Sequence, residues 1–254
     1  MLTFAPNLTT LFTEVPFLER FERAKKAGFT HVEFQFPYEH PSDAVAEQLN
    51  QHGLKAVLFN LPAGDWEKGD RGIAIFPTRR DEFRASVHTA IEYAQSLQCT
   101  MLHCMAGVKP EKLDRRDALL VYKENLRYCA REFEKYGLTV VIEPINAFDM
   151  PDYFLSNLEF AVDILNDLAL PNVKLQFDVY HMQRMQGELI SSFKKYKEHI
   201  AHIQIADNPG RHEPGTGEIH YANVFRAFEA EGYNGAIGLE YFPKGKSEDS
   251  FTWL

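Results

Sequence analysis

Short apolar runs alternate with longer amphipathic segments from one end of the chain to the other. The short runs are rich in β-branched and aromatic residues, which is typical of buried strands, whereas the longer segments repeat their apolar residues with helical spacing. The pattern predicts strands at residues 2–7, 30–35, 54–60, 100–105, 138–144, 173–179, 199–206 and 236–242. Between them lie helix patterns such as 15–28, 43–53, 79–98, 118–137 and 221–232.

This alternation predicts an α/β protein with a parallel sheet, and eight strand–helix units favour closure into a (β/α)₈ TIM barrel. The chain has 254 residues, close to the roughly 250 that the fold needs, so we expect a single domain over residues 1–254. After the last predicted strand only residues 246–254 remain for an eighth helix, which is therefore predicted to be short. Glycines that can end a helix at positive φ follow four of the predicted helices: Gly28, Gly53, Gly137 and Gly232. An open doubly wound sheet is the alternative, weakened by the lack of a G-x-G-x-x-G turn after the first strand.

Composition narrows the classes of partner. The formal net charge of −9 argues against nucleic acid or an anionic membrane, because phosphate binding depends on clustered Lys and Arg. No run reaches the roughly 18 apolar residues of a membrane span, and the N-terminus lacks the basic start of a signal peptide. Cys99, Cys104 and Cys129 show no C-x-x-C spacing, which fits reduced thiols. We expect a cytoplasmic protein, and the sequence leaves homo-oligomer formation open.

Polar residues end nearly every predicted strand, where a barrel gathers its functional side chains. These strand ends carry Asn7, Glu33, Asn60, Cys104, Glu143, Asp178, Gln204 and Glu240. Carboxylates that end apolar runs need cations, hydrogen-bond donors or a metal. The oxygens of Glu143, Asp178, Gln204 and Glu240 suit Mg²⁺ or Mn²⁺ best, with Zn²⁺ less favoured. Ion pairs with Arg or Lys are the alternative, and Cys104 is interpreted as a small buried residue.

Residues beyond the strand ends complete the predicted site. His181 follows Asp178 in D-V-Y-H and can reach a substrate oxygen. Arg211 lies in the Pro- and Gly-rich loop 206–221 and can bind an anionic substrate, unless it is only a solvated loop charge. Residues 59–77 are too long for a plain connector, and with Trp66 and Arg71 they are interpreted as a lid over a small ligand.

Several long segments in combination point to one known family: VEFQFPY, LFNLPAGDWEKGDRGIAIFP, IEPIN, FDVYHMQRMQGEL, HIQIADNPGRHEPGTGEI and GLEY. With them the chain resembles the hydroxypyruvate isomerase family, within the xylose-isomerase-like TIM barrels. The resemblance covers residues 32–241 and implies interconversion of hydroxypyruvate and tartronate semialdehyde. It also implies that Glu143 and Glu240 transfer the proton, and that Glu143, Asp178, Gln204 and Glu240 hold a metal.

Alternatives within this group remain open. A 2-oxo-tetronate isomerase shares the site pattern, and a small-ketose isomerase or epimerase uses the same scaffold, although ketose 3-epimerases usually carry His where this chain has Gln204. We expect the substrate to be a small anionic 2-oxo acid, bound by Asn60, His181 and a cation from among Arg71, Arg211 and Lys244. A metal-dependent phosphodiesterase would need a basic groove, and a non-catalytic barrel is the third class.

Overall fold

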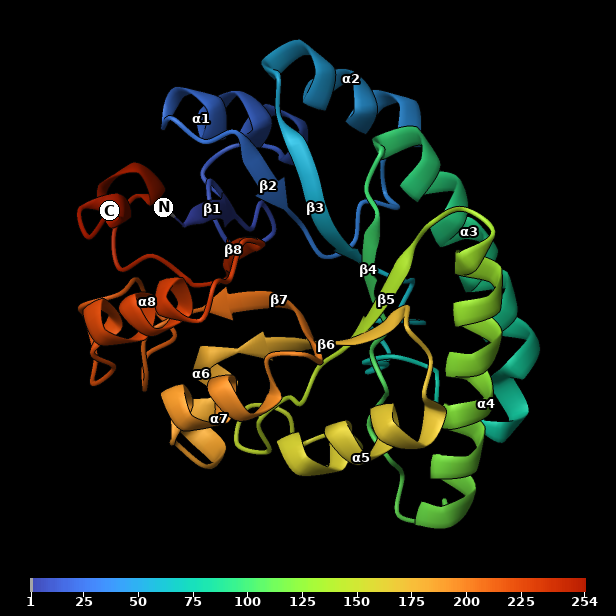
Figure 1. Ribbon diagram of the computed structural model, residues 1–254. Helices are drawn as coiled ribbons and strands as arrows, with labels where there is room; N and C mark the ends of the chain where they lie inside the picture. Colours follow the sequence, from blue (N-terminus) through green and yellow to red (C-terminus); the bar gives the residue numbers. More distant parts are fainter. Residues whose placement is uncertain (1) are drawn as a thin grey trace.

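The computed structural model describes residues 2–254, in which eight parallel strands form one sheet in the order β1-β8-β7-β6-β5-β4-β3-β2 (Figure 1). Between the two ends of this order, Asn7 and Glu33 form a parallel bridge, and the Leu8 N–H donates to the Glu33 carbonyl at 2.7 Å. These contacts close the sheet, so the predicted TIM barrel is confirmed. The strands are β1 (Thr3–Pro6), β2 (His31–Glu33), β3 (Lys55–Asn60), β4 (Met101–His103), β5 (Thr139–Ile142), β6 (Val173–Asp178), β7 (Ile200–Ile205) and β8 (Ala236–Leu239).

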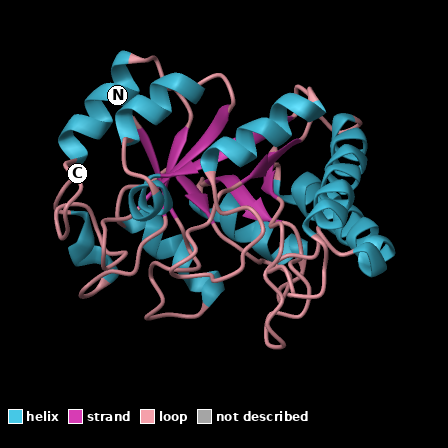
Figure 2. Ribbon diagram, turned by 90° about the horizontal axis from the view of Figure 1, so that it is seen from below, coloured by secondary structure: helices cyan, strands magenta, loops and turns pink. Residues whose placement is uncertain are grey.

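Helices surround the strands, and many long loops gather on one side of the molecule (Figure 2). The α-helices are α1 (Arg20–Lys26), α2 (Ser42–His52), α3 (Arg80–Leu97), α4 (Arg115–Glu134), α5 (Leu158–Leu168), α6 (Val179–Met185), α7 (Leu189–Tyr196) and α8 (Tyr221–Ala230). Short 3₁₀ helices are η1 (Phe17–Glu19), η2 (Pro77–Arg79) and η3 (Ser247–Phe251). Only η3 follows β8, as the shortness of the C-terminal segment predicts. None of the helices in residues 2–254 is long and apolar enough to cross a membrane.

Local sequence explains where the helices begin and end. The Asp114 carboxylate accepts backbone N–H groups of the first turn of α4, and the Asn157 side chain does the same for α5. Gly53 ends α2 at a φ of 59°, as expected from the sequence. Gln98 and Ala169 end α3 and α5 at similar positive φ without glycine, so these two ends carry no comparable sequence signal.

The apolar core lies largely between the strands and the helices, while polar side chains enter the barrel. Residues two apart on a strand face the same side, so Gln176 and Asp178 on β6 share a face, as do His202 and Gln204 on β7. Asp178 is paired in register with Gln204 on the neighbouring strand. The strands therefore bring a layer of buried polar groups to one level, just below the mouth.

Candidate active site

A small cavity of ≈ 220 Å³ opens at the carboxyl ends of the strands. Asn60, Glu143, His181, Arg211 and Glu240 line it, as the sequence predicts for a common site. The remaining lining residues are Gln35, Trp66, His103, Met105, Ile145, Asp149, Met150 and Phe242. The cavity suits a ligand of a few carbon atoms, with polar groups from several strands converging on it.

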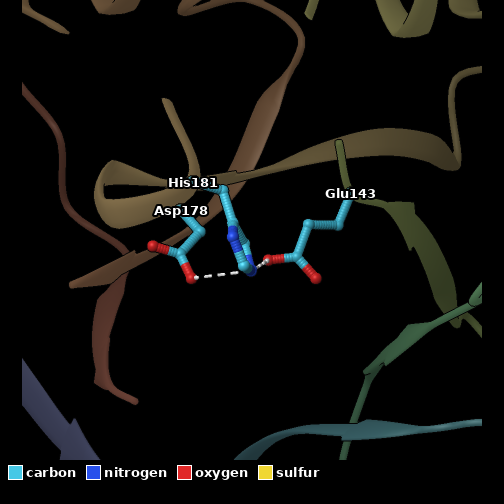
Figure 3. A group of neighbouring side chains, drawn as sticks. All are labelled: Glu143, Asp178 and His181. Atoms are coloured by element: carbon cyan, nitrogen blue, oxygen red, sulfur yellow. Dashed lines mark ion pairs between the residues drawn. The ribbon is translucent and has the colours of Figure 1, made fainter. Parts of the chain in front are cut away.

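The site contains a compact group of possible metal ligands, formed by Glu143, Asp178 and His181 (Figure 3). The Nε2 atom of His181 lies 3.6 Å from Asp178 Oδ2 and 4.0 Å from Glu143 Oε1. One ligand atom from each of the three residues lies within 4.8 Å of the others. The sequence prediction included the two carboxylates in a metal site but placed His181 on the substrate instead.

Two carboxylate oxygens of this group have unmet bonding capacity. Glu143 Oε1 and Asp178 Oδ2 are buried and have no hydrogen-bond partner, although Asp178 Oδ1 accepts the Tyr180 N–H at 2.8 Å. Burying such oxygens unpaired is unfavourable, and hard carboxylate oxygens are the donors that divalent cations prefer. The residues therefore fit a divalent metal ion.

The carboxyl groups differ from free ones because they are buried close together. Burial, reinforced by Asp178 and Glu240, raises the pKa of Glu143 well above its usual range. Burial raises the pKa of Asp178 to about 7, against the opposing charge of Arg211. Burial also raises the pKa of Glu240, and Arg211 again opposes the rise. Carboxyl groups whose proton affinity is raised in this way are suited to accept and return protons.

Glu240 is held by three donors from different parts of the chain. Arg211 approaches Oε2 at 2.7 Å, while Gln35 and Asn7 donate to Oε1 at 2.9 and 3.2 Å. Strand β8 ends at Leu239, so this carboxylate projects directly beyond the strand into the mouth. Its position is thus fixed by residues in the segments that follow β1, β2 and β7.

Arg211 enters the site from a loop organised by a buried carboxylate. Asp207 accepts backbone N–H groups of Gly215, Gly217 and Ile219 at 2.9, 2.9 and 3.0 Å. The Arg211 side chain is 22% exposed and also lies 3.9 Å from Asp178 Oδ2. Its Nε atom is buried without a hydrogen-bond partner, so the guanidinium retains a free donor.

The imidazole of His181 has one tautomer imposed on it by Asn146. The Oδ1 atom of Asn146 accepts the N–H groups of Phe148 and Asp149 at 3.1 and 2.9 Å, which fixes the orientation of the amide. Its Nδ2 atom therefore faces His181 Nδ1 at 2.7 Å as a donor. Burial and Arg211 lower the pKa of His181 well below its usual value, so the neutral ring carries its proton on Nε2. His181 is consequently a hydrogen-bond donor toward the cavity.

Gln204 lies below the cavity in the layer of buried polar groups. Its Nε2 atom donates to Glu33 Oε1 at 2.7 Å, and its Oε1 atom accepts from Gln176 at 2.5 Å. A carbonyl oxygen has two lone pairs, so this amide oxygen keeps capacity for a second partner. Gln176 and Glu33 are site residues that the sequence prediction did not assign a role.

At β4 the residue that lines the cavity is His103, which the sequence analysis did not single out, and not the strand-end Cys104. Cys104 packs into the apolar core, and burial raises the pKa of its thiol to about 12. His103, one position earlier, lines the cavity with Nδ1 3.8 Å from Glu143 Oε2. Its Nε2 atom is buried without a partner, and burial lowers the pKa of the ring to about 3. The expectation that Cys104 is a small buried residue is thereby confirmed.

The three side chains considered as cations for the substrate differ in whether they line the cavity. Arg71 stacks on Trp66 with its guanidinium carbon 3.8 Å from the ring centroid, and Trp66 itself lines the cavity. Lys244 is exposed, and its backbone N–H donates to Glu213 at 3.1 Å. Of the three, Arg211 alone lines the cavity.

Known proteins match this chain over its whole length. The profile of the family described as xylose isomerase-like TIM barrel matches residues 21–254. Hydroxypyruvate isomerase of Escherichia coli is 43% identical, covering 100% of this chain and 98% of the relative. A 2-oxo-tetronate isomerase of Pectobacterium atrosepticum is 41% identical, covering 100% and 97%. A crystal structure described as AP endonuclease, family 2, from Brucella melitensis has a TM-score of 0.98 at 45% identity, covering 100% and 98%.

Eight parallel strands, several of which end at buried carboxylates, define a barrel with a polar cavity at its mouth. The chain belongs to the xylose isomerase-like TIM barrel family. The curated relatives just described are isomerases by name, so the family and the enzyme class expected from the sequence are both confirmed.

Proposed function

We propose that this protein interconverts hydroxypyruvate and tartronate semialdehyde (2-hydroxy-3-oxopropanoate). The observation that carries the proposal is a pair of buried carboxylates, Glu143 and Glu240, which line one small cavity from the ends of β5 and β8. The names of the curated relatives support a small 2-oxo acid as substrate.

The reaction moves a carbonyl group between adjacent carbons. One carboxylate removes a proton from C3 of hydroxypyruvate; the C–H electron pair forms the C2–C3 double bond of an enediolate, and the carbonyl electrons move onto O2. The other carboxyl group returns a proton to C2, and the hydroxyl proton passes from O3 to O2 as the aldehyde forms. We assign these two roles to Glu143 and Glu240, which exchange them when the reaction runs in reverse.

We assign Glu143, Asp178, Gln204 and Glu240 as the residues that would hold a divalent metal. Their oxygen atoms favour Mg²⁺ or Mn²⁺, with Zn²⁺ less favoured. A bound ion would supply a Lewis acid that stabilises the negative charge developing on the substrate oxygens. The two unpartnered oxygens of Glu143 and Asp178 support this assignment. His181 stays outside the set because its Nε2 atom carries the proton.

We assign Arg211 to the substrate carboxylate, because its Nε atom is buried, without a partner, at the edge of the cavity. His181 and Asn60 would bind substrate oxygens, and the unpartnered Nε2 of His103 supports a similar role for this neutral imidazole. Trp66 covers the cavity from the loop after β3, with Arg71 stacked on its ring. Excluding water in this way would protect the enediolate.

A 2-oxo-tetronate is the alternative substrate, since relatives named for that activity match the chain almost as closely as the hydroxypyruvate isomerase of Escherichia coli. The charge of the chain argues against the endonuclease activity named for the structure from Brucella melitensis. A net charge of −9 and a mouth lined by carboxylates repel a phosphodiester backbone.

The test compares kcat/KM for hydroxypyruvate and for 2-oxo-tetronates, after dialysis against EDTA and again with added Mn²⁺ or Mg²⁺. We expect the higher value with hydroxypyruvate, activity lost with EDTA and activity restored by the metal. A higher value with the four-carbon acid would transfer the proposal to that substrate. Full activity in EDTA would refute the role of the metal but leave the proposed role of the two carboxylates intact.

A further inference from the structure

Glu33 is a fully buried carboxylate below the active site, at the last position of β2. Asn7 and Gln204 donate to its Oε1 at 3.0 and 2.7 Å, and His202 Nε2 lies 2.6 Å from its Oε2. These partners come from β7 and from the residue that follows β1. One carboxylate thus joins three strands of the barrel while touching none of the cavity.

Strand β8, which is separated from β2 by β1, leaves room for this side chain. Gly238 on β8 faces Glu33, and a Cβ atom at that position would lie 2.3 Å from Glu33 Oε2. No real Cβ contact is that short, so a larger residue would displace the carboxylate. The space occupied by Glu33 is therefore built into β8, two residues before Glu240.

The charge of Glu33 determines how Gln204 is oriented. A carboxylate accepts hydrogen bonds only, so the side of the Gln204 amide that faces it is the NH₂ group. The amide oxygen is then directed to the opposite side, toward Gln176. With a neutral amide in place of Glu33, either side of Gln204 could face it, and the orientation would no longer be imposed.

The same carboxylate reaches Glu240 through one intermediate. The Nδ2 atom of Asn7 donates both to Glu33 Oε1 and to Glu240 Oε1, at 3.0 and 3.2 Å. Glu33 therefore fixes the amide that in turn helps to fix Glu240. Two of the four residues assigned to the metal depend on one buried group.

We propose that Glu33 is a positioning residue that orients Gln204 and, through Asn7, Glu240 for binding a divalent metal. The inference rests on the proposed function, because it concerns the same set of metal-holding residues. Groups that orient metal ligands typically change metal affinity by about 10- to 100-fold when they are replaced.

The experiment measures Mn²⁺ affinity by isothermal titration calorimetry for wild type, Glu33→Gln, Gln204→Ala and the double variant, each with its metal-free Tm. We expect Glu33→Gln to weaken Mn²⁺ binding by at least about tenfold. In the Gln204→Ala background the same change should weaken it much less, because part of its effect passes through Gln204. Asn172→Ala is the control, since Asn172 donates to the Ala130 carbonyl at 2.8 Å and lies just before β6, at the opposite end from the mouth.

The outcomes separate this inference from the proposed function. Wild type that binds no Mn²⁺ would refute the metal site and the role of Glu33 together. Wild-type binding with unchanged affinity in Glu33→Gln would overturn only the positioning role. An equal loss in the wild-type and Gln204→Ala backgrounds would overturn the role of Glu33 in orienting Gln204. A similar loss in Asn172→Ala at a matched Tm would mean that Glu33 acts through general stability instead.

Discussion

Arg211 lies at the mouth of the barrel, in contact with two buried carboxylates. It balances two buried carboxylates, Glu240 and Asp178, and still keeps a buried Nε donor without a partner. A guanidinium in this position can grip a substrate carboxylate in two hydrogen bonds, which an ammonium cannot reproduce. Lys244 carries the same charge, and its backbone N–H contacts Glu213 in the loop that carries Arg211, but Lys244 is exposed.

We predict that Arg211→Ala raises KM for hydroxypyruvate by at least about tenfold, because the lost charge-assisted hydrogen bonds contribute about 1.5–3 kcal/mol. Lys244→Ala, the control, should leave KM unchanged. Steady-state kinetics of the two variants checks both statements. Equal effects of the two substitutions would show that Arg211 has no special role in binding the substrate.

Which side chain enters the cavity is the detail that sequence reasoning resolved least well. The strand ends correctly directed attention to Asn60, Glu143 and Glu240, all of which line the cavity. At β4 the sequence analysis interpreted Cys104 as buried but did not single out His103, one position earlier, which lines the cavity. A shift of one residue along a strand exchanges the two faces. Alternation with a period of two gives the faces but not their assignment when both neighbours are buried.

The pair at β4 gives a second prediction. We expect His103→Leu to lower kcat/KM by about tenfold or more with little change in Tm, since the ring lines the cavity. Cys104→Ala should instead lower Tm and preserve kcat, because that side chain packs only in the core. Thermal unfolding and kinetics on both variants provide the comparison, and the reverse pattern would reject this assignment of faces.

At the scale of elements, β8 and the loop after β3 do most to shape the site. Strand β8 carries Gly238 and is followed directly by Glu240, so one element positions a carboxylate of the cavity and leaves the space for Glu33. The loop after β3 is fixed where Arg79 forms two hydrogen bonds to Asp70, at 2.8 and 2.7 Å. Periodicity predicted β8 and the length of residues 59–77 singled out the loop, but neither could reveal which glycine makes room for a side chain from another strand.

We predict that Gly238→Ala destabilises the metal-free protein by about 1–3 kcal/mol, because the new methyl group would overlap with Glu33. Gly245→Ala has no neighbour within 4 Å and is the matched control. Urea unfolding measures both. An equally small change in the two variants would contradict the close approach of β8 to Glu33.

The loop anchor should depend on pH. The hydrogen bonds from Arg79 are the main cause of the lowered pKa of Asp70, so the folded state binds a proton there less readily than the unfolded state. The stabilisation is then fully present above the ordinary Asp pKa of about 3.9 and is lost as pH falls through the lower folded value. We expect Asp70→Asn to reduce stability by about 1–2 kcal/mol at pH 7.

The difference between Asp70→Asn and wild type should shrink below about pH 4, as measured by urea unfolding across pH. Asp81→Asn is the control, because that carboxylate is fully exposed and its ion pair with Arg84 is long, at 3.7 Å. A gap that stays constant from pH 7 to pH 3 would mean that the charge of Asp70 does not stabilise the loop.

At the scale of the molecule, barrel closure brings the two ends of the chain into one site. Asn7 and Glu240 are 233 positions apart and are linked by a hydrogen bond. The number and order of strands followed from apolar runs and chain length, and the strand-end carboxylates followed from the fold. Contacts such as those of Glu33 depend on strands distant in sequence, which a pattern read along the chain cannot pair.

We propose that Glu143 and Glu240 move the proton between the carbons of a small 2-oxo acid. The most direct test follows hydroxypyruvate in D₂O by NMR with wild type, Glu143→Gln and Glu240→Gln, recording tartronate semialdehyde formation and deuterium incorporation. We expect that wild type converts the substrate and incorporates deuterium, and that isomerisation is lost in both variants. Isomerisation that persists in both variants would contradict this proposal.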